Sequence, residues 1–242
     1  MSNCVSHSHE ISRRGALKAA TAIAVSSLAN IFTLENAHAA TSGADISHGD
    51  RSKPQIALTF HGAGDLAIAH QILAITKATS TPISVMAIGA WLNTNPGIGK
   101  EILDMGHDLA NHTQNHKTMT HLTLKQASAE VLAGKKSLSK VIGTNYGFFR
   151  PSGTQKSNSI IRKAAGAAGY AHCISYDVDT LDYQDPAPSA IVKNCMQSIQ
   201  NGSIVSLHLG HKNTVKALPL LIQALHDKKL VPVTLTTLLG QA

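Results

Sequence analysis

The chain has 242 residues, of which 43% are hydrophobic, 14% are charged and 4% are aromatic. Its net charge is +7 at pH 7, but the lysines and arginines are scattered, without a basic block or interleaved aromatic residues. This pattern argues against nucleic-acid binding. A basic protein is instead suited to an anionic partner such as cell-wall polymer.

The first 39 residues have the order of a secretory signal. Charged residues in Ser12–Lys18 precede an alanine-rich apolar run, Ala19–Leu34, and Ala37–Ala39 offers small residues for cleavage. The paired arginines Arg13 and Arg14 predict export by the twin-arginine route, to the periplasm or the cell exterior. The apolar run is too short and too weakly hydrophobic for a convincing spanning helix, and an uncleaved amphipathic anchor is the alternative.

Cleavage after Ala39 leaves a chain of single-domain size, for which we expect no stable membrane insertion. Residues 40–53 are rich in Ser, Gly, Asp and His and are expected to form a flexible leader, followed by one catalytic domain over residues 54–242. Cys173 and Cys195 lie in this domain. They either pair in an oxidising compartment or stay as two buried free thiols.

Short apolar runs alternate with amphipathic stretches from Gln55 onward. The apolar runs predict buried strands at 55–60, 83–88, 107–110, 146–149, 172–176, 203–207 and 231–235. The amphipathic stretches predict helices at 66–76, 97–105, 124–141, 158–168, 188–200 and 214–228. About seven βα units without a glycine-rich phosphate motif indicate an α/β fold, a parallel barrel that is regular or distorted, with an open doubly wound sheet as the alternative.

Polar residues gather where the predicted strands end. They are His61, Asp65, His112, His116, Arg150, Asp177, Asp179, Asp182 and His208. In a parallel barrel the carboxyl ends of the strands converge on one cleft, where the active sites of such folds lie. We therefore expect these side chains to share one site.

His112 and His116 are the first candidates for metal ligands. They lie four residues apart, which is about one helical turn, so both imidazoles can face one point. A catalytic divalent ion needs a third ligand, for which Asp65 is the first candidate and His61 the second. Such an ion lowers the pKa of water and polarises a carbonyl, as hydrolysis of an amide or ester requires.

The other polar residues fit acid–base chemistry. His208 ends a buried strand and is a candidate general acid, with Asp179 or Asp182 orienting its ring. Arg150 is a candidate for holding a carboxylate or another anion. For each residue alone, a structural role explains the sequence equally well, so the argument rests on their combination.

Four motifs, in order and at the expected spacing, resemble those of the polysaccharide deacetylase family, carbohydrate esterase family 4, with its NodB-type homology domain. The resemblance runs from about Gln55 to Leu239. The matching segments are His112-Thr-Gln-Asn-His116, Phe149-Arg150-Pro151-Ser152-Gly153, Asp177-Val-Asp179-Thr-Leu-Asp182-Tyr183 with Tyr in place of Trp, and Ser206-Leu207-His208.

The resemblance implies a distorted (β/α)7 barrel, a bound divalent ion with zinc as first choice, and removal of acetyl groups from N-acetylated glycans or an ester analogue. His112 and His116 would be metal ligands, and Arg150 would tether the catalytic carboxylate. His208 would be the general acid, supported by an aspartate of the segment that contains Asp179 and Asp182.

The first motif departs from the family. The family reads TFDDG, in which the first Asp is the base and the second is a metal ligand, but here Thr59-Phe60 is followed by His61-Gly62. Asp65, three residues beyond the second position, is expected to restore the ligand through a rearranged loop. His61 is expected to serve as the base or as a third imidazole ligand.

These features favour a metal-dependent glycan deacetylase. Two alternatives stay open: a carbohydrate-binding protein that has lost catalysis on the same barrel, and a hydrolase of a non-sugar amide. The presence of His112, His116, Arg150 and His208 in the order of the family motifs favours an enzyme. The missing Asp pair of the first motif favours the alternatives. The substrate and the oligomeric state are not specified by the sequence.

Overall fold

The computed structural model describes residues 41–143 and 147–240. The predicted signal over residues 1–39, residue 40 of the predicted leader and the first residue of the predicted strand 146–149 lie outside them. Among the described residues, none of the helices combines the length and hydrophobicity needed to cross a membrane.

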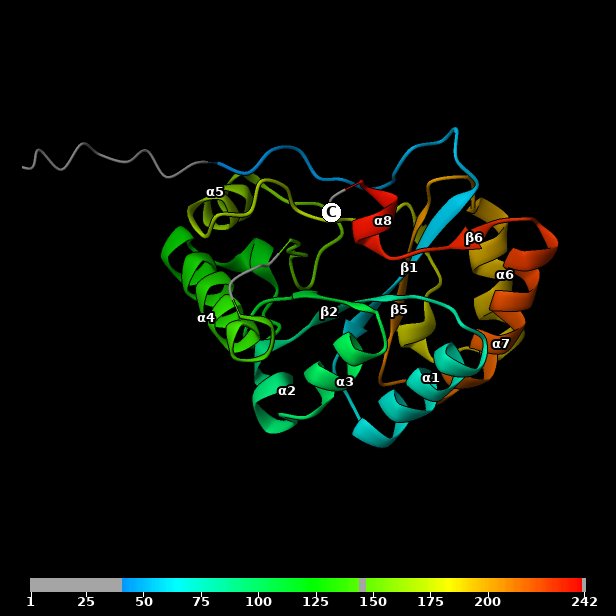
Figure 1. Cartoon of the computed structure of the whole chain (residues 1–242). Coiled ribbons are helices and arrows are strands. Elements are labelled where there is room, and N and C mark those ends of the chain that lie inside the picture. The colour runs from blue at the N-terminus through cyan, green and yellow to red at the C-terminus, as the bar shows by residue number, and fades with distance from the viewer. Residues whose placement is uncertain (1–40, 144–146, 241–242) are drawn as a thin grey trace, which may run out of the picture. The chain divides into compact units, whose positions relative to one another are not determined.

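A parallel sheet forms the centre of the domain (Figure 1). Its strands are β1 (Gln55–Gly62), β2 (Ser84–Ala87), β3 (Asp108–Asn111), β4 (Val178–Asp179), β5 (Ile204–His208) and β6 (Val231–Pro232). The order is β3-β2-β1-β5-β4, with β6 paired to the start of β1. All these pairings are parallel, which confirms the predicted α/β class.

Helices surround these strands in Figure 1, with α1, α6 and α7 to one side and α4 and α5 to the other. The helices are α1 (Leu66–Ala78), α2 (Gly89–Thr94), α3 (Ile98–Asp104), α4 (Leu124–Ile142), α5 (Ser159–Ala167), α6 (Pro188–Ser198), α7 (Lys212–Asp227) and α8 (Leu235–Leu238), with 3₁₀ turns at Met119–His121 and Asp182–Gln184. Thr123 starts α4 with a reciprocal capping box to Gln126.

Single bridges continue the sheet beyond β3. Asn111 pairs with Phe149, and Phe149 pairs with Cys173, both in parallel. The chain then runs from Cys173 into β4, which pairs with β5. Strands were predicted at 146–149 and 172–176, but the described part of these segments forms only bridges, because each segment leaves the sheet after one or two residues.

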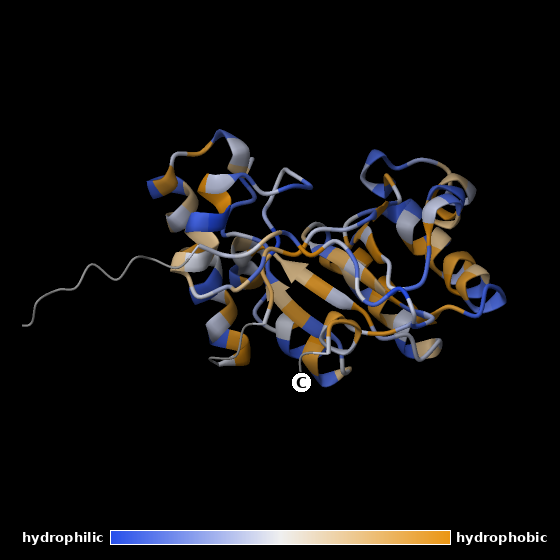
Figure 2. Ribbon diagram, turned by 90° about the horizontal axis from the view of Figure 1, so that it is seen from above, coloured by the Kyte–Doolittle hydropathy of each residue, from blue (hydrophilic) through white to orange (hydrophobic). Residues whose placement is uncertain are grey.

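The two faces of the strands differ, and this alternation places the site. In β1, Ile56, Leu58 and Phe60 join the large core between the sheet and the helices. Ala57 joins a smaller core with Ile204 of β5 and with α8. Strand side chains alternate with a period of two, so the face that carries Ala57 and Ile204 also carries the polar residues at the carboxyl ends. In the hydropathy view, the strands are mostly hydrophobic, and the helices carry both hydrophobic and hydrophilic residues (Figure 2).

Residues 41–53 are not a flexible leader as predicted. The Ile46 amide donates to the Cys173 carbonyl at 2.9 Å, and the Ser175 amide donates to the Ile46 carbonyl at 2.7 Å. Ile46 also bridges Ile174, and His48 bridges Ser203. The polar composition of the segment indicated a loop but carried no sign of these partners, which lie more than a hundred residues away.

Two short helices were not predicted, and the state of the cysteines can be given. Gly89, which directly follows the strand predicted at 83–88, begins α2. Leu235 was placed in the last strand, but it begins α8, which Thr234 caps by accepting from the Thr237 amide. Cys173 and Cys195 are both buried and free, so the alternative of two free thiols is confirmed.

Candidate active site and metal centre

His61 and His208 lie side by side at the carboxyl ends of two neighbouring strands. They are Cα partners in the register of β1 and β5. Their rings are stacked, with centroids 4.3 Å apart and planes inclined by 11°. Ser206 lies two residues before His208 on the same face, and its hydroxyl is 3.1 Å from Nε2 of His61.

His112 and His116 enter from the loop that follows β3. This loop is not the helical turn that the four-residue spacing suggested, because Thr113 and His116 have φ values of 69° and 54°. The loop is held by the Asn111 carboxamide, which accepts from the Thr113 amide at 2.9 Å, and by the Thr113 hydroxyl, which accepts from the His116 amide at 3.2 Å. The rings nevertheless meet, with centroids 4.9 Å apart.

His61, His112 and His116 form a cluster suited to a divalent metal ion. One ring nitrogen from each lies within 4.8 Å of the others. His112 is buried, His61 is partly buried and His116 is the most exposed of the three. Three imidazoles with an open side are a known donor set for catalytic zinc. The residues present therefore fit the ion that the sequence predicts.

Hydrogen bonds fix the orientation of the two inner rings. Nδ1 of His112 lies 2.8 Å from the Arg150 carbonyl, which can only accept, so Nδ1 of His112 is the donor. The lone pair of His112 is therefore on Nε2, which lies 2.8 Å from Nδ1 of His61. Both nitrogens thus face the common point of the cluster.

Charge effects keep the two inner rings neutral. Burial, reinforced by the charges of His112, Arg150 and His208, holds the pKa of His61 well below 6.5. Burial and then His116 do the same for the pKa of His112. Neutral imidazole is the form that ligates a metal, so the environment favours ligation near pH 7.

Asp182 is the aspartate that contacts His208. Its Oδ1 lies 2.7 Å from Nδ1 of His208. Its Oδ2 accepts from the His208 amide at 2.8 Å and from the Thr214 hydroxyl at 2.7 Å. Asp182 is fully buried, so the carboxylate is well satisfied and fixes His208 with its Nδ1–H inward.

The other two aspartates of this segment differ in their surroundings. Oδ1 of Asp179 accepts from the Leu181 amide at 3.0 Å, and the side chain lines the cavity that His61 and His208 share. Asp177 pairs with Arg51 at 2.7 Å and accepts from Ser203, so it ties the N-terminal segment to the sheet. Asp177 therefore stabilises the fold through Arg51 and Ser203.

Arg150 is almost fully buried beneath the site, and none of the ion pairs among the described residues includes it. Its Nε and Nη2 donate to the carbonyls of Ile174 and Ser175, and its guanidinium lies 5.3 Å from the centroid of the Tyr176 ring. Nη1 is buried without a hydrogen-bond partner in the described structure. Burial lowers the pKa of Arg150 to about 10, which still leaves it charged at neutral pH.

Asp65, the first candidate for a third ligand, lies outside the histidine cluster. It is exposed and caps α1, with Oδ1 accepting from the Ala67 amide at 2.8 Å. A helix N-cap is a common position for aspartate, and it accounts for this carboxylate without a metal. His61, the second candidate, is the residue that the fold brings to His112.

A cavity of about 340 Å³ opens over these residues, lined by His61, His116, Pro151, Gly153, Thr154, Gln155, Tyr176, Asp179, Tyr183, Ser206 and His208. Sequence reasoning assigned no role to Ser206, Tyr176 or Gln155. The signal for Ser206 was present, because it alternates with Val205 and Leu207 on the strand that ends at His208. Gln155 had no signal, since it lies in a loop.

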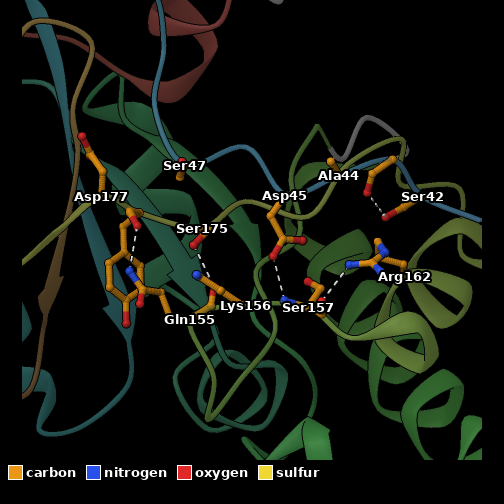
Figure 3. Close-up of a pocket in the computed structure, with 12 residues that line it drawn as sticks. Ser42, Ala44, Asp45, Ser47, Gln155, Lys156, Ser157, Arg162, Ser175 and Asp177 are labelled. Carbon is orange, nitrogen blue, oxygen red and sulfur yellow. Dashed lines mark hydrogen bonds between the residues drawn. The ribbon is translucent and has the colours of Figure 1, made fainter.

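A second cavity of about 640 Å³ adjoins the first and shares Gln155 and Tyr176 with it. Figure 3 shows its polar walls, in which Asp45 of the N-terminal segment faces Ser157 of the loop before α5. Oδ2 of Asp45 accepts from the Ser157 amide at 2.7 Å. Ser42, Ala44 and Ser47 lie along the same side (Figure 3), so the N-terminal segment forms one wall of this cavity.

Relatives in sequence include glycan deacetylases. The chain is 29% identical over 188 residues to the peptidoglycan-N-acetylglucosamine deacetylase of Bacillus cereus, covering 76% of this chain and 87% of that protein. It is 26% identical over 212 residues to the chitooligosaccharide deacetylase of Rhizobium leguminosarum, covering 79% and 91%. The uncharacterized protein YlxY of Bacillus subtilis is 26% identical, and the match spans 81% of this chain and 60% of that protein.

Solved structures share the fold. A CE4 family pseudoenzyme from Bacillus anthracis superposes with a TM-score of 0.76 at 24% identity, over 81% of this chain and 69% of that one. A peptidoglycan N-acetylglucosamine deacetylase gives a TM-score of 0.75 at 23% identity, over 81% and 92%. The predicted α/β fold, a distorted (β/α)7 barrel of the deacetylase type, is confirmed.

The family itself follows from the sequence. The model of the polysaccharide deacetylase family matches residues 48–173, which include β1 with His61 and the loop with His112 and His116. Two of the four motifs that suggested the resemblance, at His112–His116 and Phe149–Gly153, fall in the matched region, and the other two lie beyond it. The chain belongs to the polysaccharide deacetylase family.

Proposed function

We propose that this protein is a metal-dependent hydrolase that removes acetyl groups from an N-acetylated glycan such as peptidoglycan or a chitooligosaccharide. The observation that carries the proposal is one cavity lined by two histidines of the three-histidine cluster, His61 and His116, and by His208, which is paired with the buried Asp182. Family membership and the names of the relatives support the glycan as substrate.

His61, His112 and His116 would hold the ion, with zinc as first choice for an all-imidazole donor set. A divalent ion at this place lowers the pKa of water and polarises the acetyl carbonyl. Asp65 stays a predicted ligand only if its loop rearranges, since its carboxylate caps α1.

His208 would supply the proton to the leaving amine. Asp182 accepts from Nδ1–H of His208, which leaves Nε2 of the ring to face the cavity, and the anionic partner stabilises the protonated ring. In this arrangement Asp182 orients the ring and His208 transfers the proton, as expected for a histidine held by a buried carboxylate.

Asp179 is our candidate for the base that takes the proton of the attacking water. Among the residues that line the cavity, it is the one carboxylate. His61 was the first candidate for this role, but both its nitrogens are directed elsewhere, toward His112 and Ser206. Arg150 would raise the positive potential under the site and so favour the anionic acetate product.

The experiment is metal analysis of the purified protein followed by acetate release from chitooligosaccharide and peptidoglycan, with and without a chelator. We expect about one bound divalent ion, and activity that is lost with the chelator and regained with added metal. His61→Ala should abolish metal binding and activity, whereas Asp65→Asn should retain both. Full activity of the chelated protein, or metal loss in Asp65→Asn alone, contradicts these assignments.

A catalytically impaired glycan-binding protein is the second candidate, favoured by one observation. His61 and Gly62 occupy the positions where the family has its Asp pair. The same metal and acetate measurements decide between the two functions, because a binding protein would bind chitooligosaccharide without releasing acetate. Export to the periplasm or the cell exterior, predicted from residues 1–39, is part of the proposal for either function.

A further inference from the structure

Ser206 is the polar group that lies against the outer nitrogen of His61. Its hydroxyl is 3.1 Å from Nε2 of His61. The side chain is buried, and its position is fixed by β5, in which Ser206 pairs with Thr59 and its carbonyl accepts from the Thr180 hydroxyl at 2.8 Å. The backbone of Ser206 is therefore fixed by the strand beside the His61 ring.

Imidazoles that ligate metals usually donate their second N–H to an oxygen, which fixes the tautomer and the ring orientation. His112 already has this arrangement, because its Nδ1 donates to the Arg150 carbonyl and its Nε2 is left free. For His61 the free nitrogen must be Nδ1, since Nδ1 is the atom that faces His112. The proton of His61 must then lie on Nε2, opposite the Ser206 oxygen.

A hydroxyl suits this position better than a carbonyl would. Without a metal, the lone pair on Nε2 of His112 requires that His61 donates from Nδ1, so Nε2 of His61 accepts from the Ser206 hydroxyl. With Nδ1 engaged as a ligand, Nε2 of His61 carries the proton, and the same hydroxyl accepts it.

We propose that Ser206 is a positioning residue of the metal centre. Its hydroxyl keeps the His61 ring turned so that Nδ1 faces His112, and it accepts from Nε2–H when Nδ1 is a ligand, which stabilises the metal-bound tautomer. The inference rests on the metal site of the proposed function and extends it to a residue that does not touch the ion. It makes Ser206 part of the compensation for the altered first motif, because only an imidazole at position 61 needs a partner at this nitrogen.

The test is direct metal binding to the full chain stripped of metal, for the unchanged protein, Ser206→Ala and Ser206→Thr. Thr59→Val is the matched control. Thr59 is the Cα partner of Ser206, and its buried hydroxyl donates only to the Val205 carbonyl, so the variant also loses a buried strand hydroxyl. Zinc affinity is measured by chelator competition and the site geometry by the visible spectrum of the cobalt-loaded protein. The tautomer of His61 in the zinc-loaded protein is read from ¹⁵N chemical shifts.

We expect Ser206→Ala to bind zinc about 10- to 100-fold more weakly, as for other residues that orient a metal ligand. It should also change the cobalt spectrum and leave His61 as a mixture of tautomers. Ser206→Thr and Thr59→Val should resemble the unchanged protein. Unchanged affinity and tautomer in Ser206→Ala, or equal weakening in a folded Ser206→Thr, overturns the role of Ser206 alone. Failure of the unchanged protein to bind any divalent ion overturns the proposed metal centre together with it.

Discussion

Asp182 and Arg150 are both buried charged residues near the site, and they are stabilised in different ways. Asp182 accepts three hydrogen bonds and has His208 as its partner. Arg150 has two carbonyl acceptors and an aromatic face, and Nη1 has none among the described residues. A buried charge is costly unless it is paired and hydrogen-bonded, so Arg150 has the less satisfied environment of the two.

Asp182→Asn should therefore damage catalysis more than folding. The amide no longer stabilises a protonated His208, and its NH₂ group meets a donor at one of the positions where Asp182 now accepts. We expect acetate release to fall by about 10²–10⁴-fold and the free energy of unfolding to fall by about 1–3 kcal/mol. Asp185→Asn, in the same turn but exposed, is the control and should retain both.

A smaller prediction concerns Asp65. As the N-cap of α1 its carboxylate accepts from the Ala67 amide, so Asp65→Ala should lower the free energy of unfolding by about 0.5–2 kcal/mol. Denaturant unfolding measures this change. Asp65→Ser, which can still cap the helix, should recover most of the stability, and a failure to recover would point to a different role for the carboxylate.

The histidines of the site were predictable from the sequence, but the choice between Asp65 and His61 as the third candidate ligand was not. His112, His116 and His208 follow apolar runs, which strands in a parallel sheet bring to one edge. The choice between Asp65 and His61 depends on where a glycine-containing turn sends the chain after β1. Local sequence allowed both; in the fold, His61 stays within the strand beside His112, and Asp65 caps α1.

At the scale of elements, the junction of α1 with β2 contains a buried histidine outside the site. Nδ1 of His107 accepts from the Ile83 amide at 3.4 Å, and its Nε2 lies 3.1 Å from the Thr76 hydroxyl. Burial lowers the pKa of His107 below 6.5, with the charge of Asp108 opposing the shift. Protonation would remove the acceptor for the Ile83 amide and place a charge in the core.

This junction predicts a pH dependence of stability. Because the folded-state pKa is below the unfolded value, the contribution of His107 is complete above about pH 6.5 and is lost as the pH falls toward the folded pKa, by at most about 1.4 kcal/mol per pH unit. Urea unfolding at pH 5 and pH 7.5 should show a smaller difference in His107→Gln than in the unchanged protein. His226→Gln, at an exposed position, should keep the full difference. An unchanged pH dependence in His107→Gln contradicts the assignment.

Long elements were predicted well, and two short helices, α2 and α8, were not predicted. The periodic apolar residues of α1 and α4 gave boundaries close to the observed ones, since a long amphipathic stripe has only one way to face the sheet. α2 and α8 are six and four residues long. At that length a strand end and a helix start have the same composition, and the packing of neighbouring elements decides between them.

At the scale of the whole molecule, the N-terminal segment belongs to the folded domain. Its hydrogen bonds reach α5, the strand segment around Cys173 and the loop before β5. Arg51 adds an ion pair to Asp177 at 2.7 Å. Sequence patterns do not predict these contacts, because they are made largely by backbone groups, whose pairing does not depend on side-chain type.

Truncation should therefore be costly. A chain that starts at Pro54, the predicted beginning of the domain, should unfold at a lower urea concentration than one that starts at residue 41, since each lost hydrogen bond contributes about 0.5–1.5 kcal/mol. Equal stability of the two lengths would show that the segment only rests on the surface. The Arg51→Ala variant of the longer chain separates the ion pair from the backbone bonds.

The register of β1 and β5 has a mechanical consequence. The proposed acid and one proposed ligand are Cα partners on adjacent parallel strands, so their separation is set by the spacing of the sheet, about 4.8 Å between strands. That half of the site is a rigid frame, assembled before any substrate arrives. The other half, which contains His116, Gly153 and Thr154, is formed by loops. Any conformational change on sugar binding must therefore occur in these loops, while His61 and His208 stay fixed on the strands.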